Sequence, residues 1–318
     1  MKSWLLALVA VVLVTGCQPF WQSDKKAVLE DSAVVLPLGW RWESYGGIEV
    51  GVPNSWGSGT TGQPWCLNVA PGPPAPYVGR PGIVATIGCL VTKDNVPDPG
   101  SSIVRAGTFI WFSKSMDTAE KPVVVMGDRA TLTLAGVELS VLAPAVMREA
   151  ILDTLHTIAG GTNGCPLTHP ISDDPAWRPM SADPVEGLTG VTAVSACRYG
   201  EGFLVSSVRL EGGAAKEAVA NVVTASGGGG PNSPQTCAKS YAYGEEAIVL
   251  EIIASQGQGE VVMRYDGCDH HGFDDGHSVR TLTHDAVRPF FAGPNRIDSY
   301  SSALGTIMSE PAASQGSG

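Results

Sequence analysis

The chain has 318 residues, of which 43% are hydrophobic and 16% charged, and its formal net charge is −11 at pH 7. This length is enough for one large domain or two ordinary ones. Nucleic acids and anionic wall polymers carry charge of the same sign, which makes them poor partners on electrostatic grounds. We therefore expect no nucleic-acid binding.

The amino terminus has the layout of an export signal: Lys2, an unbroken apolar run from Trp4 to Val14, then small residues before Cys17. The run is short for a permanent transmembrane helix. The stretch VTGC resembles the bacterial lipobox, which implies cleavage after Gly16, a diacylglyceryl group on the Cys17 thiol and a fatty acid such as palmitate on the new amino terminus. The acyl chains would anchor the protein on the extracytoplasmic face of the cell membrane. The alternatives are an ordinary signal peptide with an incidental cysteine, or an uncleaved anchor.

An even number of cysteines remains when Cys17 is set aside. Outside the cytoplasm this is typical of disulfides, and the gaps between them are too long for the close pairs of a structural zinc site. The second half of the chain has four cysteines, which allow three pairings. A hairpin predicted there would bring Cys268 back near Cys237. The favoured pairs are Cys66 with Cys89, Cys165 with Cys197, and Cys237 with Cys268.

The order of apolar patterns predicts an α+β protein of two small domains, each an antiparallel sheet covered by one main helix. The division falls at GGTNGCP, where two glycines follow a helical pattern and a proline follows the cysteine. The expected segments are a signal peptide at 1–16, a tether at 17–36, a first domain at 37–163, a second domain at 164–292 and a disordered tail at 293–318.

In the first domain, apolar residues alternate from Ile48 to Val52, which predicts a strand that ends at Pro53. Met147, Ile151, Leu155 and Ile158 recur at helical spacing. The other expected elements are strands at 83–91, 107–114 and 122–127, a hairpin over 130–143 that turns near Ala135 and Gly136, and a helix within 143–161.

The second domain is predicted to follow the order β, β, α, β, β. This order gives a two-layer α+β arrangement. Its expected elements are strands within 192–210, a helix within 212–230 with Ala215, Val219, Val222 and Val223 inward, and a hairpin over 246–268 that turns at QGQG, residues 256–259.

Two resemblances concern fold and location. YGGIEVGVPNSW, with the sheet and helix that follow, resembles exported PsbP/Mog1-like domains, whose sequences begin with a strand running into P-x-x-W. CRY, a helix after LEGGAA, then RYDGC and GFDDG are similar to exported lipoproteins of high-GC Gram-positive bacteria. Neither resemblance carries a catalytic motif.

Residues 268–285, CDHHGFDDGHSVRTLTHD, hold four of the six histidines. Adjacent histidines in a strand cannot both face one ion, although a turn would permit it, and the spacing of a calcium loop is absent. Because glycines at 272 and 276 favour bends, we interpret the stretch as a solvated polar loop, dispensable for folding and without a stoichiometric metal. The alternative is a metal site with ligands drawn from Asp269, His270, His271, Asp274, Asp275, His277 and His284.

Other candidate residues are few. The motifs G-x-S-x-G and H-E-x-x-H are absent, and the glycines before Pro231 lack the Lys-Ser/Thr of a phosphate loop. Trp56 and Trp65 lie beside small polar residues and could line a groove for a sugar ring, although packing in the core or at an edge is the favoured interpretation. His156, expected in the last turn of a helix, and His169, in an expected turn, are interpreted as structural.

The leading functional hypothesis is a non-catalytic binding or interaction module without a cofactor, anchored to the membrane and facing an envelope protein or an extracellular ligand. One alternative is a metal-binding protein or metal-dependent hydrolase that uses residues 269–284. Another is a glycan binder that uses Trp56 and Trp65.

We expect Cys17→Ser to abolish labelling of the chain by a lipid precursor and to block normal processing, because the thiol is the acceptor of the lipid. Metabolic labelling of cells that express the variant would measure this. The Cys237→Ser variant should keep the label, and normal labelling of Cys17→Ser would contradict the anchor.

Overall fold

The computed structural model describes residues 34–59, 76–81, 108–117, 119–181, 183–296 and 302–309. The predicted anchor at Cys17, the predicted Cys66–Cys89 pair and the expected strand at 83–91 lie outside these residues. Residues Val35–Gly318 belong to one compact unit, and the described part contains three largely antiparallel sheets and few helices. Mixed α and β content is therefore present, but the predicted division into two domains is not confirmed.

The first half of the chain contributes two sheets. In the larger one, the three strands β3 (Gly57–Gly59), β4 (Tyr77–Gly79) and β5 (Phe109–Lys114) run parallel, and the remaining neighbours are antiparallel. The smaller sheet has the order β1 (Trp40–Tyr45), β2 (Ile48–Pro53) and β9 (His156–Thr157), and the larger has the order β3 (Gly57–Gly59), β4 (Tyr77–Gly79), β5 (Phe109–Lys114), β8 (Val137–Leu142), β7 (Arg129–Leu134) and β6 (Lys121–Met126).

Several predicted elements of this half are confirmed. The strand from Ile48 ends at Pro53, and β7 and β8 form the predicted hairpin with its turn at Ala135 and Gly136. The helix α2 (Ala145–Leu152) is shorter than predicted, so Leu155 lies beyond it.

Helix α2 ends at Leu152, and the residues that follow it form contacts with β2. The Thr154 hydroxyl accepts the N–H of Gly51 at 2.7 Å and donates to the carbonyl of Ile151. His156 then pairs with Glu49 as part of β9. The predicted position of His156 in the last helical turn is therefore wrong, because pairing with β2 competes with the helix.

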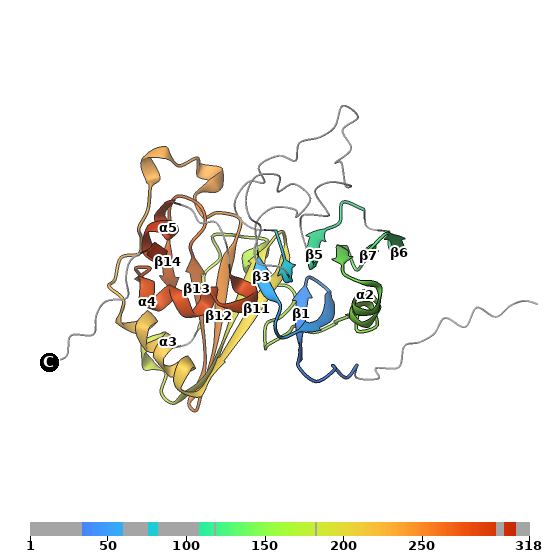
Figure 1. Cartoon of the computed structure of the whole chain (residues 1–318). Helices are drawn as coiled ribbons and strands as arrows, with labels where there is room; N and C mark the ends of the chain where they lie inside the picture. The colour runs from blue at the N-terminus through green and yellow to red at the C-terminus, as the bar shows by residue number, and fades with distance from the viewer. Residues whose placement is uncertain are drawn as a thin grey trace, which may run out of the picture. The chain divides into compact units, whose positions relative to one another are not determined.

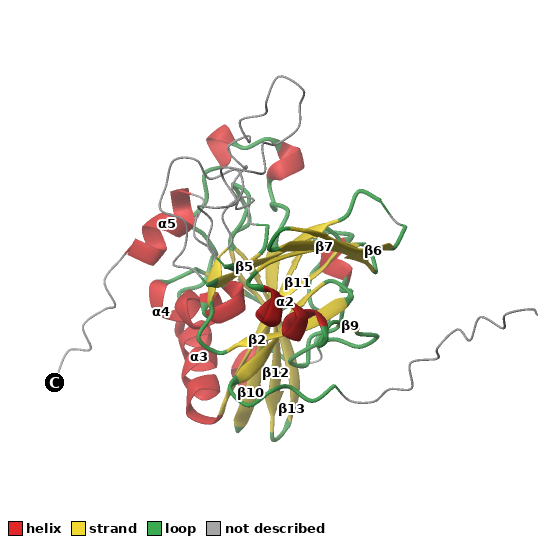
Figure 2. Cartoon of the chain, turned by 45° about the vertical axis from the view of Figure 1, so that its right-hand side comes forward, coloured by secondary structure: helices red, strands yellow, loops and turns green. Residues whose placement is uncertain are grey.

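The second half forms a six-stranded antiparallel sheet with α3 (Gly212–Thr224) packed on one face (Figure 1). Figure 2 shows the long strands of this sheet beside α3. The predicted helix and strands are present. The hairpin of β12 (Ala247–Ala254) and β13 (Gly257–Arg264) turns at Ser255 and Gln256, two residues before the centre of the predicted turn. The order is β11 (Phe203–Glu211), β10 (Val191–Gly200), β12 (Ala247–Ala254), β13 (Gly257–Arg264), β14 (Gly272–Asp274) and β15 (Val279–Arg280).

The carboxyl-terminal segment contains a helix, α5 (Ser302–Ser309), where we predicted a disordered tail. Its side chains of Leu304 and Ile307 are buried in the same core as α3 and α4 (His284–Val287). The apolar residues of this segment therefore fold against the sheet. Among the described residues, no helix is long and apolar enough to cross a bilayer.

The two predicted disulfides of the second half are confirmed. Cys165 pairs with Cys197, and Cys237 pairs with Cys268, with Cα atoms 5.5 and 5.4 Å apart. Cys165 and Cys197 are buried beneath the sheet face opposite α3. Disulfides of this kind are typical of proteins that fold in an oxidising compartment.

Contacts between β1 and β11 join the two halves. The N–H of Gly46 donates to the carbonyl of Leu204 at 2.8 Å, and Val205 lies in the same core as Tyr45. The Tyr45 hydroxyl also donates to the carboxylate of Glu201. The first sheets and the long sheet therefore share a buried interface.

Buried charges lie close to this interface. Glu43 and Arg80 are each 1% exposed and form an ion pair at 2.6 Å, and Arg80 also donates to the carbonyl of Ser44. Arg198, which is fully buried, donates to the carbonyl of Pro81 at 3.2 Å. A buried charge is costly unless it has a fixed partner. These contacts therefore hold β1, residues 80–81 and β10 in one arrangement.

Candidate functional site

The His/Asp-rich stretch lies at an edge of the long sheet and is not a solvated loop. Its strand β14 pairs with β13, and β15 pairs with β14. His271, Asp274 and Asp275 are only 2%, 4% and 1% exposed. The interpretation of the stretch as a solvated loop is therefore wrong for these three side chains, which have partners from distant segments, whereas His270 and His277 are exposed. That the stretch is dispensable for folding stays a prediction.

The carboxylate of Asp274 receives four hydrogen bonds. Arg178 donates twice at 2.7 Å, Arg264 donates at 3.2 Å, and the N–H of Gly276 donates at 2.9 Å. Burial alone would raise the pKa of Asp274, but the bonds from Arg178 and Gly276 and the two arginine charges hold this pKa below its usual value. The carboxylate therefore stays ionised between two arginines.

The Arg264 side chain binds residues 175–177 to the long sheet. Its side chain is 4% exposed, and it donates to the carbonyls of Pro175 and Trp177 as well as to Asp274. All three of its guanidinium nitrogens are thus hydrogen-bonded. This arrangement places Arg178, the next residue along, over Asp274.

Asp275 fixes the other side of the same edge. Its carboxylate accepts the N–H groups of Val185, His277 and Ser278, and Arg280 lies 3.5 Å away. Burial would raise the pKa of Asp275, but these backbone bonds and the Arg280 charge lower it overall. Neither aspartate has a carboxylate free for a metal.

The four histidines of the stretch point to different partners. His271 has both ring nitrogens against backbone carbonyls, those of Pro231 at 2.5 Å and Asp266 at 3.1 Å. His270 stacks on Tyr243, with ring centroids 4.1 Å apart. His277 contacts the carbonyl of Ser181, and His284 contacts Asp285. Within the described residues, the structure does not bring Asp269, His270, His271, Asp274, Asp275, His277 and His284 together as a set of metal ligands.

A polar pocket of about 320 Å³ lies beside this edge of the sheet. Its walls combine the two arginines and Asp274 with an aromatic stack and a glycine loop. The lining residues on which the functional argument depends are Ala176, Arg178, Gly229, Asn232, Tyr243 and His270. Sequence reasoning selected His270 and Asp274, but it missed Arg178, Asn232 and Tyr243, which no motif marks.

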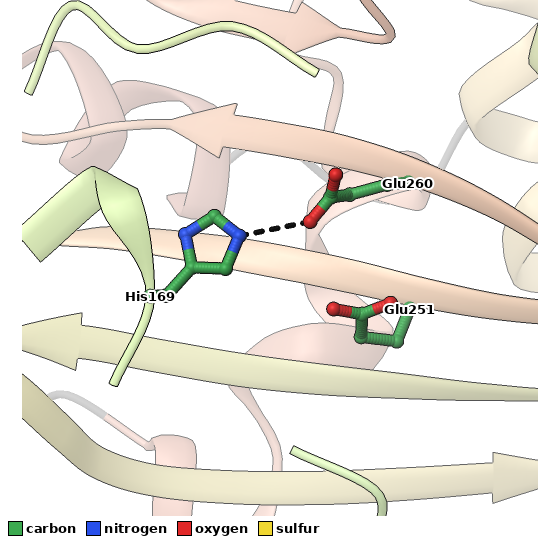
Figure 3. A group of neighbouring side chains, drawn as sticks. All are labelled: His169, Glu251 and Glu260. Carbon is green, nitrogen blue, oxygen red and sulfur yellow. Dashed lines mark hydrogen bonds and ion pairs between the residues drawn. The ribbon is translucent and has the colours of Figure 1, made fainter. Parts of the chain in front are cut away.

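A second cluster lies on the sheet face opposite α3. The side chains of His169, Glu251 and Glu260 place their potential ligand atoms within 4.8 Å of one another (Figure 3). His169 Nε2 lies 2.8 Å from Glu260, and the imidazole ring contacts Trp177 and Tyr199. Residues of this kind are able to bind a metal only if the imidazole offers a lone pair.

The hydrogen bonds of His169 argue against a metal in this cluster. The N–H of Ile171 donates to Nδ1 of His169 at 3.1 Å, so Nδ1 carries the lone pair. In the neutral ring Nε2 then carries the proton and donates it to Glu260. The imidazole therefore acts as a hydrogen-bond donor that fastens residues 169–171 to β13, which agrees with the structural role predicted for His169.

Glu251 and Glu260 oppose each other in the register of β12 and β13. The Glu251 carboxylate forms no hydrogen bond with the described residues, and burial, followed by the charge of Glu260, raises its pKa. The sequence contained this pair, but our predicted turn at 256–259 set the wrong register. A turn at Ser255 and Gln256 would have placed the two carboxylates side by side.

The tryptophans that were considered for sugar binding do not form an exposed groove in the described residues. Trp56 is 6% exposed and belongs to the core of the first half, as the packing interpretation predicted. Trp65 lies outside the described residues. The aromatic surface near the polar pocket comes instead from Tyr243 and His270.

No family model matches the chain, and no curated protein or solved structure is significantly similar to it. The resemblances to PsbP/Mog1-like domains and to exported lipoproteins stay predictions. Function is therefore inferred from the chemistry of the site itself.

We expect Asp274→Asn to lower the free energy of unfolding by about 3 kcal/mol, because it leaves the buried Arg264 without its counter-charge. Chemical denaturation at pH 7 measures this change. Asp285→Asn, at an exposed carboxylate, is the matched control and should stay within about 0.5 kcal/mol of the native chain. A loss equal to that of the control would show that the Asp274 contacts are not required.

Glu251→Gln should stabilise the fold at neutral pH by about 0.5 kcal/mol, because it removes one of two like charges that face each other across β12 and β13. A raised pKa in the folded state means that the ionised carboxylate opposes folding. That penalty is present above the folded-state pKa and disappears as the pH falls through this pKa towards the ordinary value of 4.5.

Denaturation at pH 7.5 and at pH values below 4.5 would measure the difference between the native chain and this variant. Glu217→Gln, on the exposed face of α3, serves as the control. A Glu251→Gln variant less stable than the native chain at pH 7.5 would contradict the expected repulsion.

Proposed function

We propose that the protein is a lipid-anchored, extracytoplasmic binding module, not an enzyme, and that it holds a small ligand in the pocket beside β14. The observation that carries this proposal is the polar pocket of about 320 Å³, a size within the range of small-molecule sites. A polymer or a folded partner would need a larger surface.

Rigid surroundings support a role in recognition. Arg178 and Arg264 are oriented by Asp274, and Arg264 fixes the backbone of the 175–177 segment. A site whose side chains are held before the ligand arrives loses less conformational entropy on binding. The pocket is therefore suited to selective binding.

The contacts of His271 favour a structural role over acid–base catalysis. Both of its ring nitrogens are occupied by backbone carbonyls. A general base needs a free lone pair within reach of the proton that it removes. His271 has no ring nitrogen left for that task.

The proposed location rests on the signal-like amino terminus and on disulfide chemistry. The lipobox-like VTGC provides the anchor in this proposal. The two disulfides Cys165–Cys197 and Cys237–Cys268 fit a compartment that is oxidising. A binding module anchored there would meet ligands outside the cytoplasm.

We expect small molecules that co-purify with the full chain to be lost when Ala176, on the pocket wall, is replaced by Trp. The larger side chain would fill the pocket. Mass spectrometry of the extracted small molecules gives the measurement, and Ala220→Trp, on the exposed face of α3, is the matched control. The same molecules at the same amounts in both variants would refute a ligand site here.

A further inference from the structure

The charged groups on the pocket wall leave a local positive charge. Arg178 and Arg264 contribute two positive charges, and Asp274 contributes one negative charge. The excess is one positive charge, in a chain whose formal net charge is −11. An anion is therefore favoured at this place, although most of the protein repels it.

Several hydrogen-bond donors of the pocket-lining residues lack a protein acceptor in the described part of the chain, whereas two of the acceptors are already occupied. Asp274 already accepts four bonds, and the Asn232 carbonyl oxygen accepts the N–H of His271 at 3.0 Å. Within the described residues, Nη1 of Arg178, the amide nitrogen of Asn232 and the N–H of Gly229 form no hydrogen bond. Three donors without protein acceptors match a ligand group that is rich in acceptor oxygens.

One side of the pocket is flat and aromatic. The rings of Tyr243 and His270 are nearly parallel, at 6°, and the guanidinium of Arg264 lies over the Tyr243 ring at 5.5 Å. The backbone of His270 has a φ of 57°, which is uncommon for a residue with a side chain, and Asp269 accepts its N–H. The ring is thus held in place, half-exposed, where a planar group can stack on it.

We propose that the pocket binds a small organic anion in which a planar ring carries one carboxylate or phosphate group. The ring lies against the stack of Tyr243 and His270, and the anionic oxygens accept hydrogen bonds from Arg178, Asn232 and the N–H of Gly229. This ligand class rests on the proposed binding function and makes it more specific.

Phenyl phosphate and benzoate are suitable probes, because each joins a planar ring to one of the two oxyanions. Benzamide has the ring without the charge, and inorganic phosphate has the charge without the ring. Calorimetric titration of the full chain should give at least one of the two aromatic anions an affinity roughly tenfold or more above both benzamide and inorganic phosphate.

Two variants test the assigned donors. Arg178→Gln should weaken binding of the aromatic anion roughly tenfold or more. Asn232→Asp keeps an acceptor for His271 but replaces the amide donor by a negative charge, so it should weaken binding at least as much. Arg209→Gln removes a partly exposed arginine that pairs with Glu211 and does not line the pocket, and it should leave the affinity unchanged.

The outcomes separate the ligand class from the binding function. Equal affinities for benzamide and benzoate, or unchanged binding in both Arg178→Gln and Asn232→Asp, would overturn the ligand class. A neutral or cationic molecule that co-purifies with the native chain and is lost in Ala176→Trp would also overturn it, while supporting the binding function. If Ala176→Trp and Ala220→Trp carried identical molecules, the binding function itself would fail.

Discussion

The carboxylate of Asp274 is the contact on which the proposed site depends. A buried carboxylate is costly unless several donors surround it, and here the donors come from β13, from the turn after β14 and from the 175–178 segment. Satisfying this one charge fixes the position of Arg178 and, through Arg264, the backbone before it. The pocket wall is therefore a consequence of how one buried charge is neutralised.

Two of the buried ion pairs in the described residues lie where separate segments meet. Glu43 with Arg80 lies where the first sheets approach the long sheet, and Asp274 with Arg264 lies at the far edge of the long sheet. Such pairs contribute little net stability compared with apolar side chains of equal size, but removing one partner is strongly destabilising. We infer that here they select one relative arrangement of neighbouring segments.

The histidines show why residue composition alone does not define a metal site. His271 has both nitrogens against carbonyls, His169 accepts the N–H of Ile171 at Nδ1, and His270 presents a stacked ring. A metal needs lone pairs that converge on one point, and convergence depends on hydrogen bonds made by distant residues. The number of histidines in a short stretch carries no information about those bonds.

The sequence by itself determined the local elements: the hairpin of β7 and β8, the helix α3, the strands beside it and the disulfides Cys165–Cys197 and Cys237–Cys268. Periodicity and turn residues act over a few positions, so they can be read from the chain. The shorter α2, the buried helix α5 and the pocket were decided only by tertiary structure. At the pocket, Arg178 contacts Asp274, which is 96 residues further along the chain. A hydrophilic stretch such as 268–280 is therefore predicted to be solvated when only the sequence is known, because its counter-charges are distant in the sequence.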